Sequence, residues 1–205
     1  MILLREKRNR NINLKINNVK KKLLSLFLII LLIFVTNCYR ESGNTLLQQK
    51  GKLQTEIIQL LQQIDSLGNR GEYNTLIAKD YITKAEKFSN KYPEDPMSAE
   101  FLYNAGLLAM TIAKITENQE EIELYCQKAL TIFNNIQKVY PDYHNIKNCM
   151  LNKGVVYDDI LHDYQNAEIQ YREFIVRYPT DSLAMNMELY LQFLGKTPEE
   201  ILAEM

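Results

Sequence analysis

Few side chains of this sequence could do chemistry. It has two histidines, His144 and His162, and three cysteines, Cys38, Cys126 and Cys149. It contains no nucleophile elbow, phosphate-binding loop, dinucleotide glycine pattern or zinc-protease helix. Each of those motifs would bring reactive groups together, and without them the sequence predicts a non-catalytic protein. We expect no cofactor, no bound metal and no small-molecule substrate.

Neither histidine has the sequence context of a catalytic base. His144 follows a Pro-Asp-Tyr turn, where a surface loop residue is expected. His162 comes at the end of a predicted helix, where a cation suits the helix dipole. The carboxylates of Asp158, Asp159 and Asp163 could join His162 at a metal ion. Solvated charge is the simpler interpretation of this group.

Cys38 has a different context, because it follows an apolar run almost directly. Three lysines, residues 20–22, precede the mostly apolar residues 23–35. A helix of that length reaches about 20 Å, against about 30 Å for the core of a bilayer. The run is short for a permanent span and has the size of the apolar part of a signal peptide. We therefore predict a signal peptide over residues 1–37.

The residues before Cys38 resemble a bacterial lipobox, the motif at which lipid is attached to a cysteine thiol and the chain is cleaved. Val35-Thr36 suits the motif, whereas Asn37 departs from it, because Gly, Ala or Ser is usual there. The resemblance implies lipid attachment at Cys38, with residues 38–44 as a linker. Two or three acyl chains would anchor the protein stably. The residue directly after the lipid-bearing cysteine sorts bacterial lipoproteins between the two membranes. Tyr39 at this position, in place of Asp, implies attachment to the outer membrane, with the protein facing the periplasm.

Two alternatives stay open for this segment. The cysteine could stand there by coincidence, after an ordinary signal peptide or an uncleaved anchor. The signal would have the usual length if translation began at Val19, and residues 1–18 would then be an extension.

Charge separates the N-terminal segment from the rest of the chain. Residues 1–37 have eight Lys or Arg and one Glu, a net charge of +7. The remaining residues have 16 basic and 24 acidic side chains, a net charge of −8. A body so acidic does not suit the phosphates of a nucleic acid, which we therefore exclude as a partner.

The body of the chain has a helical and repeated pattern. Beyond residue 40, apolar residues recur at spacings of three and four, the helical period. Tyr-Pro occurs three times, at Tyr92-Pro93, Tyr140-Pro141 and Tyr178-Pro179. The second and third copies follow an Ala-x3-aromatic-x2-apolar run, and glycine comes thirteen residues after the first two prolines, at Gly106 and Gly154. Proline ends each helix, because the residue before it is pushed out of the α region.

This spacing resembles the tetratricopeptide repeat over roughly residues 72–198. The resemblance implies a right-handed α-solenoid of antiparallel helix pairs. Stacking of these pairs buries apolar surface that one pair alone would leave exposed. With its Tyr-Pro endings and lipobox, the chain also resembles the BamD-like lipoproteins of outer-membrane assembly. The residues that would pack the repeats are Gly106, Ala129, Phe133 and Pro141 in the first full copy, and Gly154, Tyr157, Ala167, Tyr171 and Pro179 in the second.

The chain departs from the repeat pattern at two places. Lys153 stands where leucine is usual. About ten extra residues near 115–119 lengthen the first full copy, which predicts either a longer loop or extended helices.

In this repeat family the first helix of each pair lines a concave groove. With the glycine as position eight, positions two, five, six, nine and twelve face the groove. Asn104 and Asn152 hold equivalent positions, and their amides could bind the backbone of an extended peptide. Alternatively these positions are only solvated or packed, or the C-terminal tail covers Leu107, Met110 and Val155. The groove candidates are Glu100, Tyr103, Asn104, Leu107, Met110, Asn148, Leu151, Asn152, Val155 and Asp158.

Periodicity and turn residues give a map of the helices. Residues 45–72 hold an N-terminal amphipathic helix, residues 73–195 the repeats and residues 196–205 a short tail helix. We expect Asp95, Asp181 and Thr197 to cap helices. The predicted helices lie near residues 45–67, 73–91, 97–115, 119–139, 145–161, 164–177 and 181–194.

The two remaining cysteines should not pair. Cys126 and Cys149 belong to neighbouring antiparallel helices, at heights that differ by roughly 12 Å. A disulfide needs Cα atoms within about 7 Å of each other. We therefore predict two buried, unpaired thiols.

The N-terminal helix has a pattern of its own. Leu46, Leu53, Ile57, Leu60 and Ile64 follow a heptad spacing, and glutamines cover the other face. One interpretation is a coiled-coil dimer, which would make the protein a structural spacer of the envelope. The other, which we favour, is an amphipathic helix that caps the repeats of its own chain, because three heptads interrupted by a lysine and a glycine are marginal for a coiled coil.

These patterns together predict an all-α, lipid-anchored scaffold for protein–protein interaction on the periplasmic side of the bacterial envelope. The expected partner is a peptide segment or a subunit of an envelope complex. The expected process is outer-membrane protein assembly or envelope maintenance.

Overall fold

A computed structural model describes residues 45–204 of the chain. The predicted signal peptide, Cys38 and the linker 38–44 lie outside the described residues. Residues 45–51 belong to a different unit from residues 52–204, so the arrangement of helices is given for residues 52–204 alone. All the regular structure from residue 45 to residue 204 is helical, which confirms the all-α prediction for this part of the chain.

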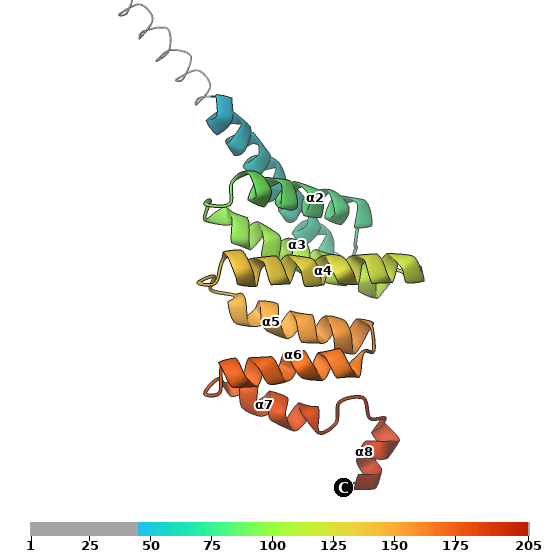
Figure 1. Ribbon diagram of the computed structural model, residues 1–205. Helices are drawn as coiled ribbons and strands as arrows, with labels where there is room; N and C mark the ends of the chain where they lie inside the picture. Colours follow the sequence, from blue (N-terminus) through green and yellow to red (C-terminus); the bar gives the residue numbers. More distant parts are fainter. Residues whose placement is uncertain (1–44, 205) are drawn as a thin grey trace, which may run out of the picture. The chain divides into compact units, whose positions relative to one another are not determined.

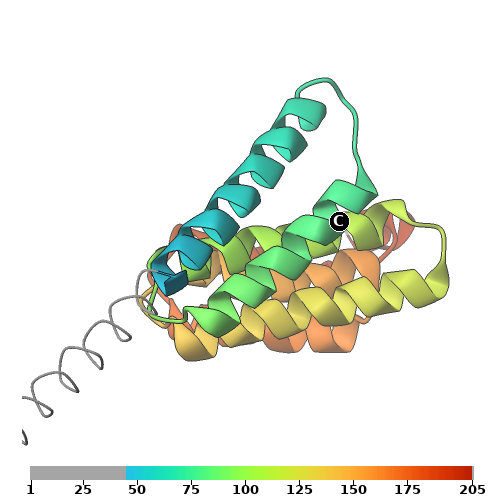
Figure 2. The ribbon, with the colours of Figure 1, turned by 90° about the horizontal axis from the view of Figure 1, so that it is seen from above.

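The helices form a stack in chain order. Each helix from α2 to α6 packs against the next one along the chain, and the connections alternate between two edges of the stack (Figure 1). Neighbouring helices therefore run in opposite directions, and the view down the stack shows them one above another (Figure 2). Residues 45–68 are helical, followed by α2 (Thr75–Lys91), α3 (Met97–Ile115), α4 (Gln119–Val139), α5 (Ile146–Val155), the π-helical turn η1 (Val156–Ile160), α6 (Tyr164–Arg177), α7 (Ser182–Leu191) and α8 (Pro198–Glu204).

The three Tyr-Pro turns have the same geometry. Tyr92, Tyr140 and Tyr178 follow α2, α4 and α6 with φ of −133°, −126° and −131° and ψ of 58°, 59° and 57°. Each tyrosine N–H donates to the carbonyl four residues earlier, and each tyrosine carbonyl accepts from the N–H three residues later at 3.0 Å. All three turns lie at one edge of the stack, on the left in Figure 1. The repeat found in the sequence is therefore also a repeat of backbone conformation.

Two glycines allow close contact between neighbouring helices, Gly106 between α3 and α4 and Gly154 between α5 and α6. A Cβ atom on Gly106 would lie 2.6 Å from the Phe133 ring, and one on Gly154 would lie 2.6 Å from Cδ1 of Tyr171. Both rings are buried, so the space that a side chain would need is already filled. Ala129, one turn before Phe133 in α4, has no exposed surface, and the equivalent Ala167 in α6 has none either.

Most predicted helix boundaries agree with the structure, and two differ. The helix predicted near 145–161 ends as an α-helix at Val155 and continues as the turn η1, while the helix predicted near 181–194 ends at Leu191. The extra residues of the first full repeat extend α3 and α4, with residues 116–118 between them, so the alternative of a long loop is wrong.

Two of the three predicted caps, Asp181 and Thr197, are present, whereas the N-cap residue of α3 is Pro96 and not Asp95. The side chain of Asp95 accepts from the N–H of Met97, although α3 begins one residue later than the Asp-Pro pair predicts. Asp181 accepts from the N–H of Leu183 at 3.0 Å. Thr197 accepts from the N–H of Glu200, whose carboxylate accepts in turn from the Thr197 N–H, a capping box.

The N-terminal helix uses its apolar face within the chain. Ile57 has no exposed surface, and Leu53, Leu60 and Ile64 pack against the core formed by α2 to α5. A two-stranded coiled coil would need the same side chains for its seam. The interpretation as a capping helix therefore agrees with the packing, whereas a dimer would require these residues to leave the core.

Candidate functional site

The predicted groove and the last helices meet at a cavity. It has a volume of about 480 Å³, and α5, η1, α6 and α7 all contribute to its wall. Three groove candidates of the second full repeat lie in that wall, namely Leu151, Val155 and Asp158. We refer to this cavity as the α5–α7 pocket, and its lining residues are Leu151, Val155, Asp158, Asp159, Tyr171, Leu183, Asn186, Met187 and Tyr190.

Asp158 is the most deeply buried carboxylate of this wall. Only 6% of its surface is exposed. Its Oδ2 atom accepts a hydrogen bond from the Tyr171 hydroxyl at 3.2 Å and another from the Tyr190 hydroxyl. Among the described residues no donor reaches Oδ1 and no lysine, arginine or histidine forms an ion pair with Asp158. The pocket therefore contains a carboxylate with one unused oxygen.

The two tyrosines hold this carboxylate from α6 and α7. Burial, and then the negative charge of Asp158, raises the pKa of Tyr171 above its ordinary value. Burial and the hydrogen bond to Asp158 raise the pKa of Tyr190 in the same direction. Both hydroxyls stay protonated at neutral pH, so they donate to the carboxylate and do not compete with it for cations.

The turn η1 places Asp158 in the wall. Its defining bond joins the Leu161 N–H to the Val156 carbonyl at 3.1 Å, five residues apart. A π turn holds one residue more than an α turn, so η1 presents its side chains in a different register from α5. After the turn His162 takes a φ of 52°, with Nδ1 3.1 Å from the Asp158 carbonyl, and Asp163 caps α6.

The charged groups around the pocket are mostly paired. Asp159 forms an ion pair with Lys114 at 3.2 Å. Asp181, at the start of α7, accepts from Lys147 of α5. No basic residue lines the pocket itself. The charge of Asp158 is therefore not neutralised by a cation of the described residues.

The α3 half of the predicted groove lies outside this pocket and is occupied by contacts within the chain. Glu100 accepts from the Tyr143 hydroxyl at 2.7 Å. The ring of Tyr103 packs beside the Tyr143 ring, with centroids 5.9 Å apart. Met110 is buried in the core, and Leu107 packs against that core.

The two asparagines expected to hold a peptide backbone face tyrosines of their own chain. The side chain of Asn104 opposes the rise that burial causes in the pKa of Tyr81, but the Tyr81 hydroxyl is buried without a hydrogen-bond partner. Asn152 and Asn148 act in the same way on Tyr103. Asn104 and Asn152 are half-buried, whereas Asn148 is exposed. The side-chain nitrogen of Asn152 is buried without a hydrogen-bond partner, so its donor is left unsatisfied among the described residues.

Sequence reasoning missed the contribution of α7. Gln192 stands thirteen residues after Pro179, where the earlier repeats have glycine. Counting Gln192 as position eight puts Asn186 and Tyr190 at groove positions two and six, and both line the pocket. Because glutamine stands at this position in place of glycine, the repeat pattern of the sequence does not assign these two residues to the groove.

The remaining side chains that could be reactive are two buried cysteines and one exposed histidine. Burial raises the pKa of the Cys126 thiol to about 11 and that of Cys149 to about 12, and both cysteines are buried and unpaired, as predicted. His144 is exposed beside Glu100, with Nε2 3.8 Å from the carboxylate. Over residues 45–204 no three His, Cys, Asp or Glu side chains converge as metal ligands would.

No helix in the described part of the chain has the length and apolar composition needed to cross a membrane. Comparison of the whole chain with protein-family models, with curated proteins and with solved structures gives no significant match.

Proposed function

We propose that this protein is a non-catalytic scaffold that binds a segment of another protein in the α5–α7 pocket. The observation that carries the proposal is the position of Leu151, Val155 and Asp158. The repeat count assigns these residues to a binding groove, and they lie together in the wall of a cavity. The cavity has a volume of about 480 Å³.

The proposed fold is a short α-solenoid of the tetratricopeptide type. Support comes from the three matching Tyr-Pro turns, from the glycine–aromatic contacts in two successive pairs and from helices that contact their neighbours along the chain. Stacked helix pairs leave one face of each repeat available for binding, which is how such arrays form extended binding surfaces.

The proposed location is the periplasmic face of the bacterial outer membrane, with lipid on Cys38. Support comes from the sequence alone, through the basic and apolar run that ends at residue 35 and the cysteine that follows it. BamD-like assembly of outer-membrane proteins, or maintenance of the envelope, is the proposed process.

A binding role fits the side chains of the pocket better than a catalytic one. Both hydrogen bonds to the Asp158 carboxylate come from tyrosine hydroxyls, and both tyrosines have raised pKa values. General acid–base catalysis needs a group that gains and loses a proton near the working pH. A hydroxyl whose pKa lies above 10 does not do this at neutral pH.

Site-specific photo-crosslinking of the full chain in its native envelope tests the proposal. A photoreactive side chain at Met187, in the pocket wall, should give a discrete adduct with one partner protein. The matched control is Val176, an apolar residue of α6 that is 80% exposed and outside the pocket. Adducts at both positions, or at neither, would contradict binding at this site.

A further inference from the structure

We propose that the α5–α7 pocket selects a peptide segment in which an arginine stands close to an aliphatic side chain. The inference rests on the proposed function, because it names the chemistry of the segment that the same pocket binds. It comes from two features of the wall, its apolar surface and the Asp158 carboxylate.

The apolar part of the wall comes from two sides of the cavity. Leu151 and Val155 lie on α5, and Leu183 and Met187 lie on α7. Leu183 keeps 39% of its surface exposed, although leucine is among the residues most often buried. An aliphatic side chain of a partner would cover all four residues, and each Å² of apolar surface removed from water favours binding.

The acidic part of the wall lacks the cation that a buried carboxylate normally has. Asp158 is 6% exposed, and its two intramolecular donors both reach Oδ2. Buried charges in proteins are usually paired with an opposite charge. The nearby cations have other partners, since Lys114 is 3.2 Å from Asp159 and Lys147 pairs with Asp181. A cation from the partner would complete the site.

Charge over the whole body favours the same ligand. Residues 38–205 have a net charge of −8, and no lysine or arginine lines the pocket. A basic segment would be attracted from a distance and then meet one carboxylate in an apolar wall. An acidic segment would be repelled at both stages.

The aromatic rings favour arginine over lysine. The rings of Tyr171 and Tyr190 lie edge to face, with centroids 5.8 Å apart and an interplanar angle of 83°. A planar guanidinium can donate to Oδ1 of Asp158 and stack on a tyrosine ring at the same time. A lysine ammonium is a point charge with stronger hydration, and it loses more on entering such a wall.

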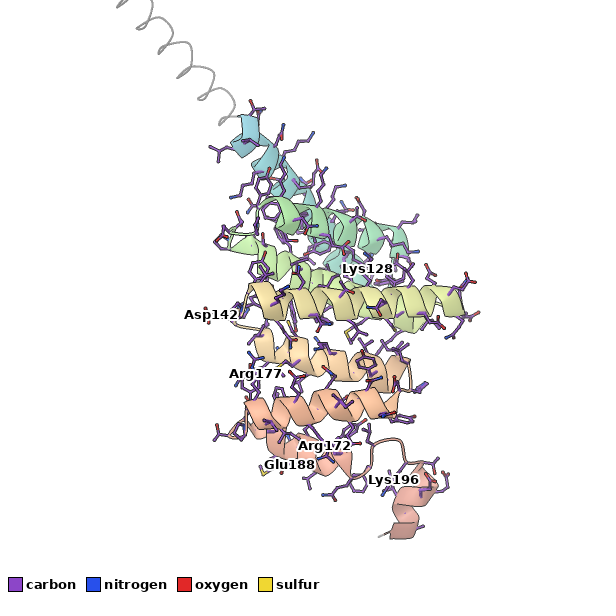
Figure 3. All side chains as sticks on the ribbon, in the orientation of Figure 1. Lys128, Asp142, Arg172, Arg177, Glu188 and Lys196 are labelled. Atoms are coloured by element: carbon purple, nitrogen blue, oxygen red, sulfur yellow. The ribbon has the colours of Figure 1, made fainter. Side chains whose placement is uncertain are left out.

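Selection from a random-peptide phage library on the immobilised full chain tests the inference. The enriched peptides should combine an arginine with a leucine, isoleucine or valine a few residues away. Leu183→Ser removes part of the apolar wall without adding charge, and it should abolish the enrichment. Asp142→Asn is the matched control for charge, because Asp142 lies in the exposed turn between α4 and α5, labelled in Figure 3.

A synthetic enriched peptide then measures the charge contact. Asp158→Asn should weaken its binding by about tenfold or more, whereas Asp142→Asn should leave it unchanged. Replacing the peptide's arginine by glutamine should weaken binding to the wild type by a similar factor. The glutamine peptide should lose nothing further on Asp158→Asn, because the two changes remove the same contact. The comparison of the arginine peptide with the glutamine peptide uses only the wild-type protein. It therefore tests the charge contact even if the Asp158→Asn variant does not fold.

The outcomes separate the inference from the proposed function. Peptides that bind in the pocket, with loss on Leu183→Ser but with no preference for arginine, would overturn the inference and leave the scaffold function standing. No enrichment on the wild type over Leu183→Ser would overturn both. Self-association that Asp158→Asn abolishes would place a second copy of the chain in the pocket and overturn the choice of partner.

Discussion

The ring of Tyr171 lies directly against the backbone of Gly154, so close that one methyl group on that glycine would overlap the ring. Phe133 and Gly106 have the same relationship one repeat earlier. The helices α3 and α4, and likewise α5 and α6, therefore meet at a contact where a side chain larger than glycine would have to displace a buried aromatic ring.

Gly154→Ala should destabilise the protein although alanine is the better helix former. The methyl group has to displace the Tyr171 ring, and overpacking of this kind costs about 1–3 kcal/mol. Urea denaturation measures the change. Gly51→Ala is the matched control, because a Cβ atom there meets nothing within 4 Å. It should leave stability unchanged or raise it by up to about 1 kcal/mol, and equal effects of the two substitutions would contradict the packing described.

Ala167→Glu should destabilise the protein by several kcal/mol, because it forces a charge into a site with no exposed surface. A domain of this size has a total stability of roughly 5–15 kcal/mol. Val176→Glu places the same side chain on the exposed face of the same helix and should be nearly neutral. If the thermal midpoint of Ala167→Glu matched the wild type, the register of α6 against α5 would be wrong.

Asn104→Ala should leave the stability of the protein unchanged or raise it slightly, because the Tyr81 hydroxyl near this amide is buried with no hydrogen-bond partner and alanine is the better helix former. Tyr81→Phe should also cost little stability, since it removes a buried hydroxyl that has no partner. Urea denaturation measures both changes. A loss of about 1 kcal/mol on Asn104→Ala that disappears in a Tyr81→Phe background would show that the two side chains are hydrogen-bonded.

Lys153→Met should stabilise the protein at neutral pH and lose that advantage in alkali. Lys153 is 8% exposed, and burial lowers its pKa from 10.5. Between the lowered pKa and 10.5 the unfolded chain binds the proton that the folded chain has released, so wild-type stability rises with pH in this window. The Lys153→Met variant has no amine at this position, so its stability does not rise in this way. Denaturation of both proteins at about pH 7 and about pH 10 measures the stability difference between the variant and the wild type. The tyrosines that titrate near pH 10 are the same in both proteins, so their effect cancels from this difference.

The control for this measurement is Lys87→Met, which changes an exposed lysine of α2. It removes the same charge from an exposed position, so it reports how far a lysine-to-methionine change alters stability without burial. A pH-independent difference for Lys153→Met would mean that Lys153 is not charged and buried as described.

Cys38→Ala should abolish lipid attachment. Cells that express the wild type should incorporate a palmitate analogue into this protein, and cells that express the variant should not. Cys126→Ala is the control, because Cys126 is buried in α4. Equal labelling of the wild type and Cys38→Ala would end the lipoprotein proposal.

The parts of the fold that could be predicted depend on short-range effects. Proline acts on the residue directly before it, so the ends of α2, α4 and α6 followed from Tyr92, Tyr140 and Tyr178. The side chains of Asp181 and Thr197 bond the helix starts next to them, so these caps followed too.

The parts that could not be predicted depend on contacts between distant residues. The π turn η1 carries no sequence signal of its own, and Asp158 is held there by Tyr171 and Tyr190, 13 and 32 residues further along the chain. Leu183 and Met187 join the pocket because α7 packs on α6. The spacing of residues within one repeat has no information about these partners.

The matching Tyr-Pro turns have a consequence for how this chain could evolve. Since each turn returns the backbone in the same direction, duplication of one helix pair would add a layer without altering the layers before it. The natural place for growth is α7, where Met185 and Leu189 keep 65% and 56% of their surface exposed. A lineage that gained a pair there would cover this apolar surface and lengthen the stack in a single genetic event.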